Sequence, residues 1–314
     1  MMRVAPASAR WRRACRAVPA LGAGIVLAVA LAGCKGVLDK GVLDPQGPVG
    51  LQQRTILLNA TAVMLAIVVP VALATLAFAW WFRDGNARAR YRPDWSYSGR
   101  IEFVVWSIPA LVILFLGGMT WIATHDLDPA RPLRSARAPL TVEVVSLDWK
   151  WLFIYPDRGI AAVNRLVVPA GTPISFRLTS ASVMNSFFVP QLGSQIYTMA
   201  GMQTRLHLLA DRPGTYRGLS AQYSGSGFSD MGFEVVAKEP DAFEAWVSET
   251  RGRGETLDRA GYDALARPSQ REPTREFGAV APNLFDTIMK SVTASSAALI
   301  CAPPKQAAEL RGDK

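Results

Sequence analysis

The 314-residue sequence predicts a two-helix transmembrane hairpin, then an all-β sandwich, then a short helical C-terminal extension. Two long runs without a charged residue, 56–82 and 103–124, predict the hairpin. Short apolar or alternating segments separated by Pro- and Gly-containing turns fill 139–237 and predict the sandwich. Beyond 238 the apolar residues recur at helical spacing, which predicts the extension.

The composition favours a membrane protein with a water-exposed part, because half of the residues are hydrophobic and only 19% are charged. The net charge is +9, but five arginines precede Cys34 without an acidic residue among them, so more than half of this charge belongs to the leader. No basic run with interleaved aromatic residues occurs in the remainder. We therefore do not expect a nucleic-acid partner.

Residues 1–33 are typical of a secretory signal peptide, with a basic start followed by an uncharged stretch. The stretch ends in Leu31-Ala32-Gly33-Cys34, which resembles the bacterial lipoprotein box. In lipoproteins this cysteine receives a diacylglycerol, so Cys34 is the predicted lipidation site and the start of an outer segment, 34–55. An ordinary cleavage site beside a chance cysteine is the alternative.

The two predicted spans are 56–82 and 102–124, and each has the roughly 20 residues that a helix needs to cross the hydrocarbon core. Tryptophans near their ends suit the membrane–water interface. Pro70 and Pro109 are tolerable where neighbouring helices satisfy the freed backbone groups. Two buried helices of a soluble protein are the alternative, which the length of the uncharged runs disfavours.

The loop 83–101 predicts the orientation of the hairpin. It contains five arginines and two aspartates, so the positive-inside rule places it in the cytoplasm. The lipobox independently places Cys34 outside. Both signals place the sandwich at 139–237 and the C-terminus in the periplasm. They predict a protein of the bacterial inner membrane.

The predicted strands include Trp149-Lys150-Trp151, and a later turn reads Pro-Gly-Thr-Tyr at 213–216 before a Gly-rich loop. In this order, after two spans, these features resemble subunit II of the haem–copper respiratory oxidases, over about 44–290. The resemblance implies a cupredoxin-type sandwich. In the cytochrome c oxidases of this family that sandwich holds a two-copper centre, ligated by a histidine and by a later Cys-x-Glu-x-Cys-x-x-x-His-x-x-Met loop.

Laid on this sequence, the ligand positions are almost all substituted. They fall at Asn185, Ser220, Gln222, Ser224, Phe228 and Met231, of which only Met231 is the expected residue. A serine hydroxyl does not bridge copper as a thiolate does, and a phenyl ring offers no lone pair. We therefore expect no metal centre and no cofactor bound by this chain. The two histidines, His125 and His207, do not fall at ligand positions.

The substituted loop resembles the quinol oxidase branch of the family. That resemblance implies a subunit of a proton-pumping oxidase that takes electrons from quinol, not from cytochrome c, and reduces oxygen to water. The expected partners are subunit I, which would hold the haems and the copper, the other oxidase subunits and membrane lipids. Two alternatives stay open: a copper-bearing cytochrome c oxidase subunit II, and a stand-alone periplasmic lipoprotein.

Three further residues have roles implied by the resemblance. Trp149 and Trp151 correspond to an aromatic patch that accepts electrons in copper-bearing relatives, and here we expect packing or contact with the haem subunit. Glu102 lies seven residues before Pro109, the spacing of a carboxylate at the mouth of a proton path in relatives. We expect Glu102 to assist proton uptake, with a plain interfacial carboxylate as the alternative. Cys301 receives no role, and the tail from about 302 is expected to be disordered.

Overall fold

The computed structural model describes residues 41–90, 92 and 94–301. The predicted signal peptide, the lipidation site at Cys34 and the tail from 302 lie outside the described residues.

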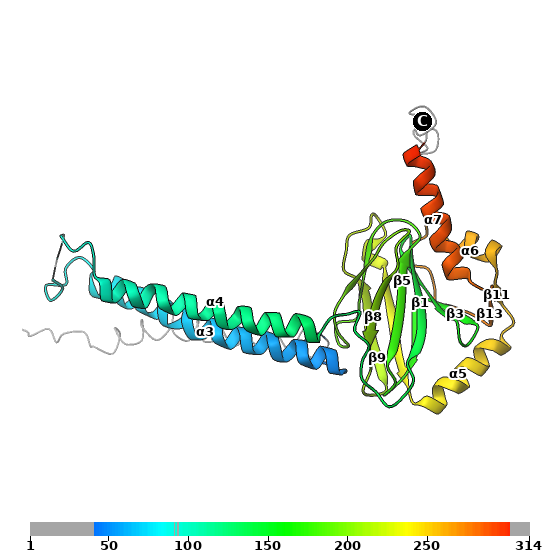
Figure 1. Ribbon diagram of the computed structural model, residues 1–314, viewed down its shortest axis with the longest axis horizontal. Coiled ribbons are helices and arrows are strands. Elements are labelled where there is room, and N and C mark those ends of the chain that lie inside the picture. The colour runs from blue at the N-terminus through cyan, green and yellow to red at the C-terminus, as the bar shows by residue number, and fades with distance from the viewer. Residues whose placement is uncertain (1–40, 91, 93, 302–314) are drawn as a thin grey trace, which may run out of the picture. The chain divides into compact units, whose positions relative to one another are not determined.

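Two long helices, α3 (Pro48–Trp81) and α4 (Gly99–Asp126), lie side by side in Figure 1. Their most apolar stretches have mean hydropathies of 2.5 and 2.1, so both helices are long and apolar enough to cross a membrane. α3 begins eight residues before the predicted span, because Pro48 suits the first turn, where a missing N–H leaves no hydrogen bond unmade. The uncharged run located the span but not the start of the helix.

Two sheets form the sandwich, which Figure 1 shows in green and yellow. The six-stranded sheet has the order β12 (Arg275–Phe277), β3 (Ile160–Val163), β2 (Lys150–Tyr155), β1 (Leu140–Leu147), β5 (Ile174–Ser180), β8 (Thr204–Leu208). The five-stranded sheet has the order β4 (Arg165–Pro169), β10 (Gly232–Lys238), β9 (Gly214–Ser220), β6 (Asn185–Phe188), β7 (Ile196–Thr198). β1 pairs with β5, and β4 with β10, in parallel; the other pairs within these two sheets are antiparallel. The predicted fold class is confirmed.

Both faces of the six-stranded sheet are covered, and strand β2 shows why. Side chains alternate between the two faces of a strand. Trp151 and Phe153 face the core between the sheets, whereas Leu152 and Ile154 face a second apolar cluster on the outer side. This arrangement explains why β2 is a continuous apolar run and not an alternating one.

The C-terminal extension builds that second cluster and is part of the sandwich. It contains α5 (Pro240–Gly252), β11 (Thr256–Leu257), α6 (Arg259–Leu265), β12, β13 (Ala279–Val280) and α7 (Leu284–Cys301). Tyr262, Phe277 and Phe285 pack against the outer face of the six-stranded sheet. The sequence predicted only helices here. The structure adds three short strands, and β12 extends the sheet beside β3.

Candidate functional site

The expected ligand positions come together at one end of the five-stranded sheet. β6, which begins at Asn185, pairs with β9, which ends at Ser220. Asn185 and Ser220 therefore lie at the same end of the sheet. The loop 221–231 continues from β9, contains the short 3₁₀ helix η1 (Phe228–Asp230), and returns into β10. We call 221–231 the ligand loop. The structure thus assembles the six aligned positions into one site.

At the centre of this site, two neutral polar side chains bind each other. The Ser220 hydroxyl donates to Asn185 Oδ1 at 3.2 Å. Asn185 Nδ2 donates to the carbonyl of Val183 at 3.2 Å. Asn185 and Ser220 are only 1% and 5% exposed, so their polar atoms need these partners. The first of the expected ligand positions is therefore occupied by an amide whose oxygen and nitrogen both have hydrogen-bond partners.

The other side of the ligand loop is held by weaker contacts. Ser224 Oγ donates to Met231 Sδ at 3.8 Å, and Met231 is buried. The ring of Phe228 meets the exposed ring of Tyr223 edge-on, with 5.6 Å between the ring centroids. Gln222 contributes its backbone carbonyl, which lies 3.2 Å from Ser220 Oγ and shares the single hydroxyl hydrogen with Asn185 Oδ1.

These residues do not fit a two-copper centre. The site offers two hydroxyls, two amides, a phenyl ring and one thioether, where a bridged copper pair needs soft thiolates and terminal imidazoles. Within the described ranges, no group of three or more His, Cys, Asp or Glu side chains could hold a metal ion. His207 lies on β8, and His125 lies at the end of α4, where its Nδ1 is 2.8 Å from the carbonyl of Trp121.

Trp149 covers the ligand loop from outside. It precedes β2 in a left-handed conformation, with φ of 66°, and its indole Nε1 donates to the carbonyl of Ser224 at 3.0 Å. A Cβ on Gly227 would lie 2.4 Å from the indole ring, so this residue must be glycine. The sequence showed a Gly-Ser-Gly segment here but gave no sign of the ring that requires it.

Trp151 has a different environment from Trp149. It is fully buried and packs edge-on against Phe187, with ring centroids 5.5 Å apart. Its indole Nε1 donates to the carbonyl of Met231 at 3.4 Å. Trp151 therefore contacts the ligand loop from the core, and Trp149 contacts it from outside.

A segment of the C-terminal extension, residues 267–272, also grips this region; we call it the strap. Lys150 is 1% exposed, and its ammonium donates to the carbonyl of Arg267 at 2.9 Å and to Ser269 Oγ at 2.5 Å. Burial lowers the pKa of Lys150, and the Glu272 carboxylate 3.9 Å away opposes that shift. Sequence reasoning missed the strap, although a lysine inside the apolar run of β2 was a signal that it needed partners.

The strap reaches the ligand loop directly as well. Arg271 Nε lies 3.1 Å from Asp230 Oδ2, in η1. Asn164 connects the strap to β2, because its Nδ2 donates to the carbonyl of Glu272 at 2.8 Å and its Oδ1 accepts from the backbone of Trp151 at 2.9 Å. The strap therefore holds both the ligand loop and the strand beneath it.

The remaining predicted site residues lie away from this cluster. Glu102 is exposed in the first turn of α4, with Pro109 two turns further along the same helix. Cys34 lies outside the described residues. The structure does not assign either residue a function.

Comparison with known proteins identifies the family. The model for the periplasmic domain of cytochrome c oxidase subunit II matches 157–238, and the COX aromatic-rich motif matches 251–294. The "Cytochrome bo(3) ubiquinol oxidase subunit 2" of Pseudomonas aeruginosa is 50% identical over 83% of this chain and 78% of its own length. The "Ubiquinol oxidase subunit 2" of Acetobacter aceti is 52% identical over 85% and 86%. The chain belongs to the ubiquinol oxidase subunit 2 family.

More distant relatives of this family carry a broader name. The "Quinol oxidase subunit 2" of Bacillus cereus is 36% identical over 76% of this chain and 81% of its own length. The predicted family is confirmed. Two alternatives were left open: the copper-bearing subunit II and the stand-alone lipoprotein. The relatives named ubiquinol oxidase subunit 2 support neither of them better than they support the predicted quinol oxidase subunit.

Proposed function

We propose that this chain is subunit II of a terminal oxidase that oxidises quinol, reduces oxygen to water and moves protons across the membrane. One observation carries the proposal: the copper-ligand positions are assembled but filled by Asn185, Ser220 and their hydrogen-bonded neighbours. A sandwich with these side chains cannot receive electrons from cytochrome c through copper. A membrane-soluble quinol removes the need for such a centre.

In this proposal the chain has no catalytic centre of its own. Subunit I would hold the haems and the oxygen-site copper, and the other oxidase subunits and membrane lipids would complete the assembly. The outer sandwich would act as a packing surface. The buried core around Trp151 and the strap at 267–272 support that role, because both contact the ligand loop through protein groups alone.

The proposed location is a bacterial inner membrane, with loop 83–101 in the cytoplasm and the sandwich in the periplasm. The arginines of that loop and the two apolar helices support this orientation. A lipid on Cys34 would add an anchor at the outer face.

For Glu102 we propose a role in proton uptake into subunit I. Its place in the first turn of α4, at the cytoplasmic end of the span, supports this role. A carboxylate at that depth is a candidate for moving protons.

Purification of the whole complex in mild detergent tests the proposed function. We expect haem absorption bands to co-purify with this chain, copper only at the level of the oxygen site of subunit I, and oxygen consumption with quinol but not with reduced cytochrome c. Additional copper with oxidation of cytochrome c would support the copper-bearing alternative. A chain that purifies without haem would support the stand-alone lipoprotein.

A further inference from the structure

The loop after α3 begins with a well-capped helix end. α3 finishes in an aromatic cluster, Trp80 and Trp81, followed by Phe82. Asn86 Nδ2 donates to the carbonyl of Trp81 at 2.5 Å, and Arg83 Nη1 donates to the carbonyl of Trp80 at 2.9 Å. The Arg83 guanidinium also lies over the Trp80 ring, 4.8 Å from its centroid. These contacts hold the loop against the aromatic end of the helix.

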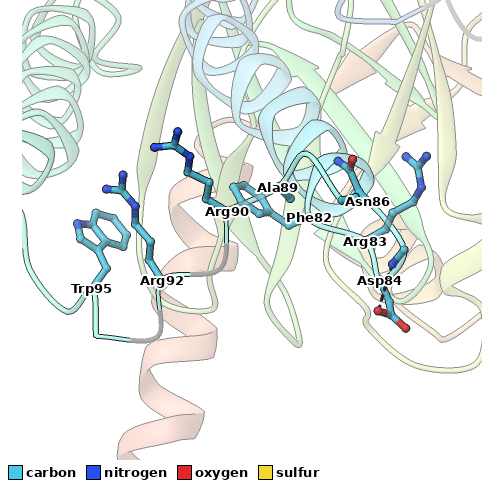
Figure 2. Close-up of a pocket in the computed structure, with 10 residues that line it drawn as sticks. Phe82, Arg83, Asp84, Asn86, Ala89, Arg90, Arg92 and Trp95 are labelled. Atoms are coloured by element: carbon cyan, nitrogen blue, oxygen red, sulfur yellow. Dashed lines mark hydrogen bonds between the residues drawn. The ribbon is translucent and has the colours of Figure 1, made fainter.

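The loop then folds back through a series of tight turns. Gly85 takes a φ of +85°, which favours glycine, and Asn86 N donates to the carbonyl of Arg83 at 3.1 Å. Ala89 N donates to the carbonyl of Asn86 at 3.0 Å. Near the second helix, Trp95 N donates to the carbonyl of Arg92 at 3.3 Å. An open cavity of about 680 Å³ lies along these turns, and Figure 2 shows the residues that line it.

This cavity combines aromatic and cationic side chains. Phe82 and Trp95 supply rings, and Arg83, Arg90 and Arg92 supply guanidinium groups. In Figure 2 the arginines extend away from the carboxylate of Asp84, the one acidic residue among those that line the cavity.

Two arginines of the cavity, Arg90 and Arg92, form no ion pair among the described residues. Both side chains are exposed. Two unpaired guanidinium groups beside one cavity can bind a phosphate through charge-assisted, bidentate hydrogen bonds.

The position of the cavity identifies the source of that phosphate. It opens where the uncharged run of α3 stops and the first arginine follows, which is the boundary between hydrocarbon and water. A soluble phosphate has no apolar part to contact the rings of Phe82 and Trp95. The glycerol and upper acyl chain of a phospholipid lie at the boundary between hydrocarbon and water and can contact these rings. Basic clusters next to a transmembrane helix attract anionic lipids.

We propose that Arg90 and Arg92 bind the phosphate of an anionic phospholipid in the cytoplasmic leaflet, with Phe82 and Trp95 against its glycerol region. The site is independent of the electron donor, and it depends only on α3 and α4 crossing the membrane.

The test compares charge-matched variants of the full chain in its purified oxidase complex. Native mass spectrometry would count phosphatidylglycerol and phosphatidylcholine molecules that remain bound during stepwise removal of lipid. Arg90→Gln and Arg92→Gln, each made as a single variant, should each reduce retained phosphatidylglycerol about fivefold if each arginine contributes ~1 kcal/mol. Phosphatidylcholine should be unchanged. Arg88→Gln is the control, because Arg88 lies in the same loop but does not line the cavity.

Further arms separate this proposal from its rivals. Arg92→Lys keeps the charge but not the bidentate geometry, so retention should be intermediate. Equal losses in the Arg88 and Arg90/Arg92 variants would overturn the proposal, because they would show a general attraction without a site. Displacement of the bound lipid by millimolar inorganic phosphate would identify a soluble anion instead. Loss of partner subunits with unchanged lipid would identify a protein contact.

Discussion

The hydroxyl of Ser220 donates a hydrogen bond of 3.2 Å to the side-chain oxygen of Asn185, joining two of the expected ligand positions. Both residues are buried, and each also bonds to a backbone carbonyl of a neighbouring loop residue. The site is therefore centred on a hydrogen-bonded pair of neutral side chains. Removal of this hydrogen bond should lower the stability of the sandwich and leave electron transfer in the oxidase unchanged.

Ser220→Ala should destabilise the sandwich without slowing turnover. The change leaves Asn185 Oδ1 buried without its donor, which costs about 1–3 kcal/mol. The fall in melting temperature of the purified complex, followed by scanning fluorimetry, measures this cost. Ser226→Ala is the control, since Ser226 is exposed in the same loop and should change stability by less than about 0.5 kcal/mol. A large loss of quinol oxidation in Ser220→Ala at full assembly would contradict a purely structural role.

Lys150→Met should loosen the strap. The methionine retains the apolar stem but removes the ammonium that bonds to the carbonyl of Arg267 and to Ser269, and it leaves Glu272 without its nearby cation. We expect hydrogen exchange in 267–272 and in the ligand loop to accelerate at least tenfold, which corresponds to ~1.4 kcal/mol.

Two comparisons make the strap prediction specific. Lys290→Met removes a cation on α7 that has no ion pair in the described ranges, and it should leave strap exchange unchanged. Glu272→Gln combined with Lys150→Met should cost less than the sum of the two single changes, because the residues contact each other. Additive costs would show that the pair does not interact.

Glu143 should make the sandwich less stable as pH rises. Burial raises its pKa above the ordinary 4.5, more strongly than the Arg177 guanidinium, 2.5 Å away, lowers it, and Asp286 adds a smaller upward shift. The folded state then binds the proton more tightly than the unfolded chain. The free energy of unfolding therefore falls as pH rises from about 4.5 through the raised pKa.

Glu143→Gln should remove that pH dependence, because the amide does not ionise. Hydrogen exchange of the β1 and β5 amides, corrected for the intrinsic effect of pH on exchange, measures the slope. Glu239→Gln, at an exposed position, should retain the wild-type slope. An unchanged slope in Glu143→Gln would assign the pH dependence to another group.

The sequence predicted the elements of the sandwich better than their environment. The apolar run of β2 indicated a buried strand, but the residues that cover its outer face, such as Phe277 and Phe285, come from more than one hundred residues later. Local pattern carries no information about contacts at that separation. For this reason the extension was predicted as separate helices, although it completes the sheet and its second core.

The site shows the same division. Spacing predicted that Ser220, Ser224 and Met231 belong to one segment, and the structure has them on β9 and the ligand loop that follows it. The contact between Lys150 and Ser269 and the ring of Trp149 over Gly227 were not predicted. The position of the Trp149 ring depends on the left-handed backbone conformation of that residue. The contact of Lys150 depends on the strap, which is distant in the sequence.

Cys34→Ser should abolish lipidation without releasing the chain from the membrane. If the lipobox is used, growth with labelled palmitate should label the wild-type chain, and Cys301→Ser as the matched control should be labelled equally. The two helices should retain the Cys34→Ser chain in the membrane fraction after carbonate washing, since transmembrane helices anchor a chain more firmly than acyl groups do. Labelling that persists in Cys34→Ser would place the lipid on another residue.

Glu102→Gln should slow proton-coupled turnover while leaving assembly intact. The amide has nearly the same shape but cannot carry a proton, and Glu102 lies in the exposed first turn of α4, where no described side chain depends on its charge. In proteoliposomes we expect quinol oxidation and proton release to fall severalfold at an unchanged haem content. Asp94→Asn removes a carboxylate from the loop that precedes α4 and should leave both rates unaltered. Raising the internal proton concentration should partly restore the rate of Glu102→Gln, because a slow uptake step responds to proton supply. Equal turnover of Glu102→Gln and wild type would make Glu102 a plain interfacial carboxylate.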